Sequence, residues 1–548
     1  MEKVVIRICQ EILNIDGIGV DDQFLELGGD SLLAMKALNR LQEITKVKLS
    51  FEVMFTSSMA EIANLIANEQ RKEVPGFQLE ITERMTEGYP LTLEQQRLWF
   101  LWKLEPQNPF YTLQGNVSIK GIVDIGRLKQ AWLHVVKSHD ALRARFIENN
   151  GKPYQQFLEI DDIDFPIYDL TGIDKVKQDE FMKEAAAQEI NKPFSLDKDL
   201  LFRLKGFRLS ENECAVLFTT HEIVMDAWSL SIIMRQLKKV YSDLHKGNYI
   251  PGNQEPQYNL RHYAHWENLN IRPDSLALQG EYWKNNLSGK LPVLDIPTDV
   301  KREGAPTYRG SSEGLLLDFD VSKKLKEISR SRNATLFMTL LTAFDILLYN
   351  YTGQEDIIIG SPHVNRNIPG TEELVGFFLN MLPLRVKLSD SDTFIELLDK
   401  VKKTVVNGFS NSNYPFLWMV GFADTIRDGS TSPIFQVMFN MYSERPENNH
   451  KARTGEADVI DISFREMETG FTKYELTLYA QEHGERIYLQ FSYFTDLYQK
   501  SFIQRMLKNF EVLLRSITAN PERKISAFEF LSSEEKKMLV STLNQTTR

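Results

Sequence analysis

Thr219-Thr220-His221-Glu222-Ile223-Val224-Met225-Asp226-Ala227-Trp228-Ser229 is the segment around which the rest of the chain is organised. The apolar run Cys214–Phe218 precedes it and predicts a buried strand, and Leu230–Leu237 follows it with apolar residues at helical spacing. His221 and Glu222 therefore stand at the end of a strand, and an aspartate follows at the start of a helix. Turns of this kind are where a scaffold presents reactive groups. A buried histidine with ordinary turn acids would show the same pattern, so the remaining sequence has to decide between the two.

Length and charge narrow the class of protein. A chain of 548 residues is too long for one core, and the usual domain size predicts about three or four units. The net charge of −11 argues against binding to a nucleic-acid backbone, because there is no basic excess to displace counterions. No run of about 18 uncharged apolar residues appears, and residues 1–7 lack the features of a signal peptide, so we expect no membrane association. Cys9 and Cys214 lie in apolar segments and predict reduced core thiols in a cytoplasmic protein.

Residues 1–70 predict a small all-α unit. Apolar residues recur at helical spacing over three stretches, which are Lys3–Leu13, Ser31–Ile44 and Ser58–Ala67. Between the first two lies Gly28-Gly29-Asp30-Ser31-Leu32, where two glycines permit a tight turn and a serine opens the next helix. Serine is a favoured helix cap, which is the simplest structural role for Ser31.

The Gly-Gly-Asp-Ser-Leu sequence in a helical unit of this size resembles the attachment site of carrier proteins. The resemblance implies a four-helix peptidyl carrier domain over residues 1–70, with 4′-phosphopantetheine attached to Ser31 by a phosphopantetheinyl transferase. A hydroxyl at a helix N-terminus is exposed, and the helix dipole there favours a phosphodiester. Asp30 occupies a position that is often His in peptide-synthetase carriers, and Asp is common there when an epimerising domain follows.

The rest of the chain predicts a linker and a large α/β region. Residues 71–88 lose hydrophobic periodicity and gain charge, Pro and Gly, as linkers do. Beyond them, short β-rich runs alternate with amphipathic helices over about 450 residues, which is too long for a single lobe. The clearest of these runs are Phe157–Ile160, Cys214–Phe218, Asp356–Ile359 and Ile487–Tyr493.

Seven segments of this region resemble, in the same order, the motifs of condensation domains of non-ribosomal peptide synthetases. The turn at His221 falls where that family has His-His-x-x-x-Asp-Gly-Trp-Ser. The other segments are Pro90–Trp99, Ser138–Phe146, Leu260–Trp266, Gly360–Arg366 with Val375–Pro383, Asn413–Phe416 and Arg427–Pro433. With the carrier in front, the resemblance covers nearly the whole chain.

This resemblance implies two lobes of chloramphenicol-acetyltransferase-like fold, arranged as a V-shaped pseudo-dimer with the active site in a tunnel between them. We place the N-terminal lobe at residues 89–265 and the C-terminal lobe at 266–525. Residues 526–548 resemble the connector that leads into an adenylation domain, which the chain lacks.

The family's reaction joins a donor acyl or peptidyl thioester to the amine of an aminoacyl thioester on a downstream carrier, forming an amide. The resemblance implies that the donor is carried on Ser31 and that the partners are a downstream acceptor carrier and adenylation domains. The second His of the motif is the family's candidate for deprotonating or positioning the amine. In this chain His221 matches the first His, Glu222 replaces the second, and Ala227 replaces the Gly.

The replacement at Glu222 leaves three hypotheses open. Glu222 could orient the amine, although a carboxylate with a reference pKa of about 4.3 is a weak base unless burial raises that pKa. The domain could instead be a docking or gating module, or it could perform modified chemistry such as dehydration or cyclisation. An epimerisation domain shares the fold, but residues 227–229 and 376–380 resemble the condensation versions of their motifs.

Other polar residues have expected roles that follow from the resemblance. Asp226 is structural in this family and pairs with an arginine, for which the candidates are Arg366, Arg143 and Arg145. His221 is expected to orient the loop by hydrogen bonding rather than to act as a base, and Asn380 is expected near the tunnel. His262 and His265 are spaced i, i+3 but have no evident third ligand, so no metal site is expected.

Overall fold

The N-terminal unit contains four helices in the computed structural model. The model describes residues 1–29, 31–47, 49, 51, 53–68, 85, 88–121, 123–250, 256, 258–301, 307–368, 370–423, 433–442 and 460–537. The first four helices are α1 (Glu2–Leu13), α2 (Ser31–Thr45), α3 (Val53–Thr56) and α4 (Met59–Asn68). Their apolar faces meet in a common core, as the periodicity predicted. Apart from residues 85 and 88, the predicted linker lies outside the described residues.

The N-terminal lobe is built on a five-stranded sheet with the order β12-β2-β7-β6-β5. Its strands are β2 (Thr112–Lys120), β5 (Ile167–Asp169), β6 (Phe202–Ser210), β7 (Glu213–His221) and β12 (Asp461–Glu466). Helices α6 (Ile125–Ser138) and α8 (Ala227–Lys246) pack on one face, where Trp132 stacks on Phe218. Helix α7 (Lys175–Ile190) packs on the other face. Because both faces are covered, β7 is buried along almost its whole length.

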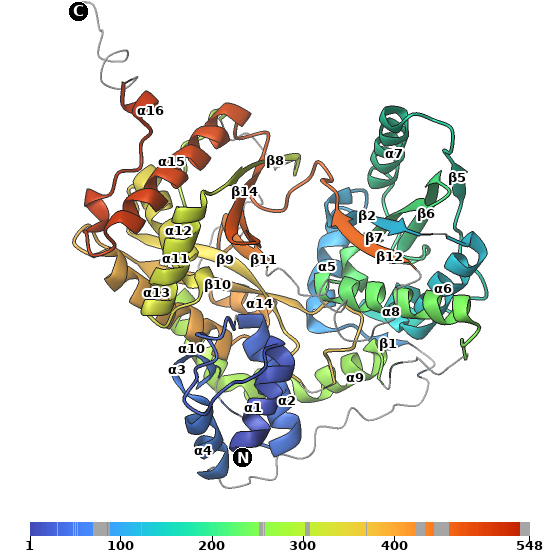
Figure 1. The fold of residues 1–548 in the computed structure, drawn as a ribbon, viewed down its shortest axis with the longest axis horizontal. Helices are drawn as coiled ribbons and strands as arrows, with labels where there is room; N and C mark the ends of the chain where they lie inside the picture. The colour runs from blue at the N-terminus through green and yellow to red at the C-terminus, as the bar shows by residue number, and fades with distance from the viewer. Residues whose placement is uncertain are drawn as a thin grey trace, which may run out of the picture.

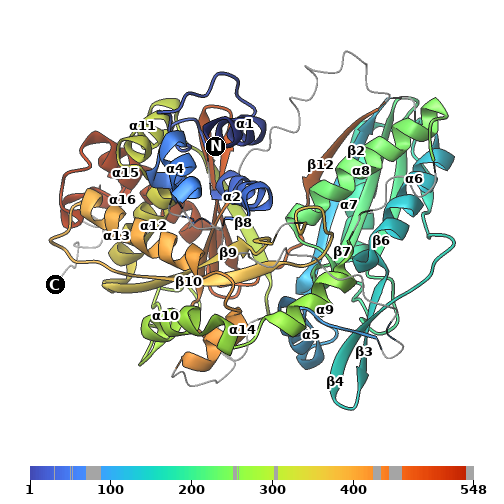
Figure 2. The same cartoon turned by 90° about the horizontal axis from the view of Figure 1, so that it is seen from below.

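A small sheet and two helices complete the N-terminal lobe. A three-stranded sheet has the order β1-β4-β3, with β1 (Tyr89–Pro90), β3 (Ala144–Asn149) and β4 (Lys152–Phe157). Helices α5 (Leu93–Leu104) and α9 (Leu260–Asn270) lie between this sheet and the other lobe (Figure 2).

The C-terminal lobe is built on a six-stranded sheet with the order β10-β9-β11-β13-β14-β8. Its strands are β8 (Gly310–Leu316), β9 (Asp356–Val364), β10 (Leu379–Lys387), β11 (Val437–Tyr442), β13 (Leu476–His483) and β14 (Arg486–Phe494). Its helices are α10 (Ala277–Leu287), α11 (Phe319–Ser331), α12 (Leu336–Thr352), α13 (Phe394–Ser410), α14 (Phe416–Met419), α15 (Lys500–Ala519) and α16 (Ser533–Lys537). Figure 1 shows most of these helices on the side of the sheet that faces away from the N-terminal lobe.

The fold class predicted from the sequence is confirmed: an all-α carrier precedes a two-lobed α/β domain, with the lobes side by side (Figure 1). The carrier lies against the C-terminal lobe, below it in this view. Among the described helices, none reaches the length and apolarity of a membrane span by itself; α11 and α12 do so only when taken together, across a bend of 109°.

Two predicted boundaries differ from the structure. Residues 266–525 do not form a self-contained lobe, because β12 crosses over and pairs antiparallel with β2 of the N-terminal sheet. The predicted division between residues 265 and 266 falls inside α9, which is continuous. The predicted strand run Phe157–Ile160 is also wrong, because β4 ends at Phe157. Local periodicity cannot show that a strand leaves one lobe to complete the other.

Candidate functional site

The turn at the end of β7 lies at the junction of the two lobes. β7 ends at His221, a short 3₁₀ turn covers Glu222–Val224, and α8 begins at Ala227 with Asp226 as its N-cap. The Asp226 side chain accepts a hydrogen bond from the Ser229 amide, which is the usual way to satisfy an orphan donor at a helix start. The strand runs three residues beyond the predicted run Cys214–Phe218 and ends at His221, so the polar side chains lie at the strand end in the lobe junction.

His221 orients the turn. Its Nδ1 accepts a hydrogen bond from the Ile223 amide at 3.1 Å, so this nitrogen is already engaged. Burial, reinforced by the nearby Lys473 ammonium, lowers the pKa of His221 to about 3. The imidazole is thus neutral and fixed, which agrees with the expected loop-orienting geometry.

Asp226 pairs with Arg366, the first of the three candidates. Arg366 Nη2 lies 3.1 Å from Asp226 Oδ1, and Nη1 donates to two main-chain carbonyls at 2.6 Å. Both side chains are almost fully buried. The two alternatives are wrong, because Arg143 pairs with Asp140 at 2.9 Å and Arg145 donates to Gln156.

Glu222 forms an ion pair that the sequence did not predict. Lys473 Nζ lies 2.5 Å from Glu222 Oε2, and it comes from the segment between β12 and β13. The Lys473 ammonium also lies 5.6 Å from the centre of the Tyr111 ring. Arg97 of α5 is close enough to interact electrostatically with Glu222. No local pattern could have revealed Lys473, since the two residues are separated by 251 positions.

Asn380 lies beside the cavity, between Leu379 and Met381, which both line it, and its side chain is held by main chain. Its Nδ2 donates to the carbonyls of Ser412 and Tyr414 at 2.7 and 2.8 Å, and its Oδ1 accepts from the amides of Phe416 and Met381 at 2.9 Å. The side chain is fully buried and its hydrogen-bonding capacity is used by main chain. Asn380 therefore secures the loop after α13, and a direct part in the reaction stays a prediction.

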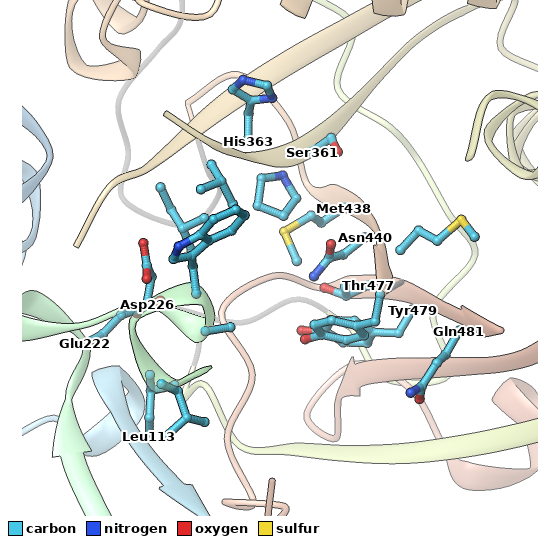
Figure 3. Close-up of a pocket in the computed structure, with 18 of the residues that line it drawn as sticks. Leu113, Glu222, Asp226, Ser361, His363, Met438, Asn440, Thr477, Tyr479 and Gln481 are labelled. Atoms are coloured by element: carbon cyan, nitrogen blue, oxygen red, sulfur yellow. The ribbon is translucent and has the colours of Figure 1, made fainter. Parts of the chain in front are cut away.

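A single cavity of about 4440 Å³ connects the carrier with the turn. Glu222 and Asp226 line it from the N-terminal lobe, and β9, β11 and β13 line it from the C-terminal lobe (Figure 3). Gly28 and Gly29, which precede Ser31, also line it. The loop before Ser31 and the turn at Glu222 thus open into the same space.

The loop before Ser31, the predicted attachment residue, makes a tight turn. Gly28 has a φ of +88°, which other residues adopt only with strain, and a Cβ on Gly29 would lie 2.2 Å from the Phe24 ring. The two glycines therefore permit a close turn directly before α2, which begins at Ser31. Gly28 and Gly29 of this loop line the cavity. Asp30 lies outside the described residues.

Helix α2 docks the carrier on the same loop that holds the Asp226–Arg366 pair. Asn39 Nδ2 donates to the Arg366 carbonyl at 2.7 Å and to Glu372 at 3.0 Å. Lys36 Nζ lies 4.6 Å from the centre of the Trp228 ring, and Trp228 Nε1 donates to the Glu372 carbonyl at 2.9 Å. The carrier therefore contacts Arg366, whose side chain is bonded directly to Asp226 of the turn.

Among the residues that the structure describes, no group of three or more His, Cys, Asp and Glu side chains is arranged to hold a metal ion. His262 is used in the fold, since its Nδ1 accepts from the Asn259 amide at 2.9 Å.

Comparison with known families matches both parts of the chain. Residues 85–540 match the condensation domain, and residues 3–66 match the phosphopantetheine attachment site. A linear gramicidin synthase of Brevibacillus parabrevis is 36% identical over 557 residues, covering 100% of this chain and 11% of that protein. Surfactin synthase subunit 1 of Bacillus subtilis (strain 168) is 31% identical, covering 99% of this chain and 14% of that protein. The chain thus spans about a tenth of the length of these relatives.

Solved structures show the same fold. The X-domain from teicoplanin biosynthesis superposes with a TM-score of 0.73 at 22% identity, covering 83% of this chain and 100% of that one. The four-domain non-ribosomal peptide synthetase AB3403 superposes with a TM-score of 0.72 at 20% identity, covering 82% of this chain and 34% of that one. At such identities the likeness concerns the fold.

Proposed function

This chain belongs to the condensation-domain family, with a phosphopantetheine attachment domain in front, and from that premise we propose that it joins two tethered substrates through an amide bond. The carrier holds the donor chain as a thioester, and the acceptor is an aminoacyl thioester on a downstream carrier. The observation that supports this most directly is the cavity shared by the loop before Ser31 and by Glu222. Delivery on a tether makes the encounter of the two substrates intramolecular, which removes much of its entropic cost.

The prosthetic group supplies the thiol that carries the donor acyl group when it is attached to Ser31. Gly28 and Gly29 leave room beside the attachment point, and Leu33 and Lys36 of α2 line the cavity farther on. These residues would hold the proximal part of the group.

The proposed step replaces a carbon–sulfur bond by a carbon–nitrogen bond. The acceptor amine attacks the donor carbonyl carbon, the thiol leaves, and one proton passes from nitrogen to sulfur. Glu222 accepts a hydrogen bond from the incoming amine and so orients it, in place of the family's second histidine. The amine has to displace Lys473 from Glu222, and the freed ammonium then stabilises negative charge as it develops on the carbonyl oxygen.

The same ion pair favours a second candidate function. Glu222 already has a partner, so the turn could serve as a closed gate in a docking module rather than as a reactive site. Modified chemistry on the tethered chain remains the third hypothesis. The three differ in what happens to the mass of the donor.

The test follows both carriers by intact-mass spectrometry. A donor acyl-phosphopantetheine is loaded on Ser31, and an aminoacyl acceptor carrier is added to wild type, Glu222→Gln and Ser31→Ala. Glu511→Gln is the matched control, because Glu511 is a buried, ion-paired glutamate on α15 outside the cavity. We expect donor mass on the acceptor in wild type and in the control, a large loss in Glu222→Gln, and no loading in Ser31→Ala.

Each hypothesis has its own result. Full turnover by Glu222→Gln would remove Glu222 from the mechanism. No transfer with any acceptor would favour gating, and a donor whose mass changes without an acceptor would favour modified chemistry. Deuterium entering the donor α-carbon from heavy water would instead indicate epimerisation. Adenylation domains, the phosphopantetheinyl transferase and a cytoplasmic location stay predictions.

A further inference from the structure

Glu222 and Lys473 belong to different parts of the fold. Glu222 follows β7 of the N-terminal sheet, whereas Lys473 lies on the segment that runs from β12 back to β13 of the C-terminal sheet. Lys473 Nζ is 2.5 Å from Glu222 Oε2, and the Glu222 side chain is only 9% exposed. A buried carboxylate is therefore covered by an ammonium whose main chain leads into the other lobe.

The main chain beside Lys473 is anchored to Tyr308, which lies shortly before β8. The Thr472 amide donates to the Tyr308 carbonyl at 2.9 Å. A second hydrogen bond, from the Gly310 amide to the Gly470 carbonyl at 2.8 Å, joins the same two segments. Glycine at 310 permits this close approach, because a Cβ there would lie 2.8 Å from the side chain of Thr472. The position of Lys473 therefore depends on that of Tyr308.

Tyr308 is held in a strained backbone conformation. Its φ is +59°, and among the described residues it is the only aromatic residue with a positive φ. Strain of this kind persists only where the surroundings impose it. On one side, the Thr307 amide donates to Asp496 at 3.2 Å. On the other side, the Arg309 carbonyl accepts from the Thr495 amide at 3.0 Å. The fold, rather than local preference, therefore sets the direction of the Tyr308 ring.

The Tyr308 ring reaches the N-terminal lobe. It stacks on Phe110, with ring centres 4.3 Å apart and ring planes at 17°. Phe110 lies shortly before β2, whose first residue is paired with the last residue of β7. The ring of the next residue, Tyr111, has its centre 5.6 Å from the Lys473 ammonium. The Phe110–Tyr308 stack thus bridges the lobes beside the Glu222–Lys473 pair, and all four side chains line the cavity.

We propose that Tyr308 is a positioning residue, which holds Lys473 on Glu222 through its main chain while Phe110 of the other lobe fixes its ring. The inference rests on the proposed function, in which the acceptor amine has to displace Lys473. A firm anchor keeps the displaced ammonium near the carbonyl oxygen on which charge develops. The same anchor makes displacement harder, because an ammonium that cannot withdraw competes with the amine for Glu222. The stack therefore sets the balance between acceptor binding and turnover.

The first test measures how firmly Lys473 is held, and it needs no turnover. The full chain is treated with a short pulse of an N-hydroxysuccinimide ester, and acylation of Lys473 is quantified by peptide mass spectrometry. Phe110→Ala removes one ring of the stack, and Tyr308→Gly removes the other while glycine keeps a positive φ without strain. We expect Lys473 to be acylated several-fold faster in both variants than in wild type. Tyr308→Phe, which keeps the stack, should match wild type.

Tyr442→Ala is the matched control for the loss of a stacked ring. Tyr442 stacks on Tyr479 within the C-terminal lobe, with ring centres 5.6 Å apart and planes at 7°, and it lines the same cavity. Its removal should leave the acylation of Lys473 unchanged. Acylation at the wild-type rate in either folded variant of the Phe110–Tyr308 stack, or an equal increase in Tyr442→Ala, would overturn the inference.

The second test separates positioning from packing. Ser31 is loaded with a donor, and single-turnover transfer is measured against the concentration of an aminoacyl acceptor carrier. We expect Phe110→Ala and Tyr308→Gly to lower both the half-saturating acceptor concentration and the maximal rate several-fold, since a loosened Lys473 is easier to displace but less well placed afterwards. A lower maximal rate alone, as a loss of folded protein would give, would overturn the inference. No transfer in any chain, with faster acylation in both variants, would count against the proposed function and leave the anchoring of Lys473 supported.

Discussion

At the scale of single residues, the structure assigns different roles to the polar residues of the turn after β7. His221 is engaged with the main chain and Asp226 is held by Arg366, so neither is free to react with a substrate. Glu222 lines the cavity, with Lys473 as its counter-ion. The site thus contains the Glu222–Lys473 ion pair at the position where the family motif has its second histidine.

Removing the Asp226 carboxylate should destabilise the protein strongly. Asp226→Ala leaves the buried Arg366 guanidinium without its counter-ion, and breaking a buried pair costs about 3–5 kcal/mol. Urea unfolding of wild type and variant measures the change. Asp162→Ala removes an exposed acid paired with Lys129 and should leave the unfolding midpoint nearly unchanged. An unchanged unfolding midpoint for Asp226→Ala would contradict a structural role.

Replacing Asp345 should instead stabilise the protein. Asp345 lies in the core on α12, where neither carboxyl oxygen is hydrogen-bonded to any residue that the structure describes, and burial raises its pKa well above the ordinary value of 3.8. Asp345→Leu keeps the shape and removes the unsatisfied group, so we expect a gain of about 1–3 kcal/mol in the free energy of unfolding at pH 8.

The pH dependence of this gain has a defined sign. The folded state binds the Asp345 proton more tightly than the unfolded state, so wild type loses stability as the pH rises above about 3.8. The advantage of Asp345→Leu should therefore grow between pH 4 and pH 8, as followed by urea unfolding at each pH. Asp345→Asn, which cannot ionise, should remove the pH dependence at this site while keeping a buried polar group. A pH-independent difference between wild type and Asp345→Leu would show that Asp345 is not protonated in the core.

At the scale of elements, α2 and the loop that contains Arg366 form one contact. Asn39 reaches the Arg366 carbonyl, the Arg366 side chain reaches Asp226, and Asp226 begins α8. Phe51 of the carrier adds an edge-to-face contact with Phe409 of α13, with ring centres 5.4 Å apart. The docked carrier therefore contacts the loop whose arginine side chain holds the turn in its conformation.

Weakening this contact should loosen the loop. Asn39→Ala removes two hydrogen bonds and leaves a buried carbonyl without this donor, so we expect faster amide hydrogen exchange over residues 370–376. Arg7→Ala, at an exposed position on α1, should leave that exchange unchanged. Equal exchange in Asn39→Ala and wild type would mean that the carrier does not stabilise the loop.

At the scale of the whole molecule, β12 joins the two lobes. It leaves the C-terminal half of the chain and pairs with β2, where the Phe464 ring covers Gly115 so closely that a Cβ would lie 2.0 Å from it. The space at Gly115 is thus part of the connection between the lobes, and Lys473 lies on the segment that returns from it.

A side chain at position 115 should weaken the pairing of β12 with β2, which joins the two lobes. Gly115→Ala forces Phe464 to move, and overpacking of this kind costs about 1–3 kcal/mol. We expect easier separation of β12 from β2, seen as increased proteolysis within 461–475 and as a larger radius of gyration in X-ray scattering. Gly421→Ala, where a Cβ meets open space, is the control. Proteolysis equal to wild type would show that Phe464 is not needed for the crossover.

The sequence by itself determined the features that are encoded locally. Helical periodicity predicted the carrier helices, the Gly-Gly-Asp-Ser segment predicted Ser31 as the attachment residue, and the ordered motifs predicted the two-lobed fold. These features depend on neighbouring residues, so a single sequence is enough to recognise them. The family match and the structure confirm the fold and the attachment domain.

Only the tertiary structure decided which distant residues meet. It paired Asp226 with Arg366 rather than with Arg143 or Arg145, brought Lys473 to Glu222, and bonded the Asn380 side chain to main chain. It also sent β12 across to the other lobe. Each of these contacts joins segments far apart in the chain, and the path of the strands through space decides which of many polar residues of similar chemistry come within hydrogen-bonding distance.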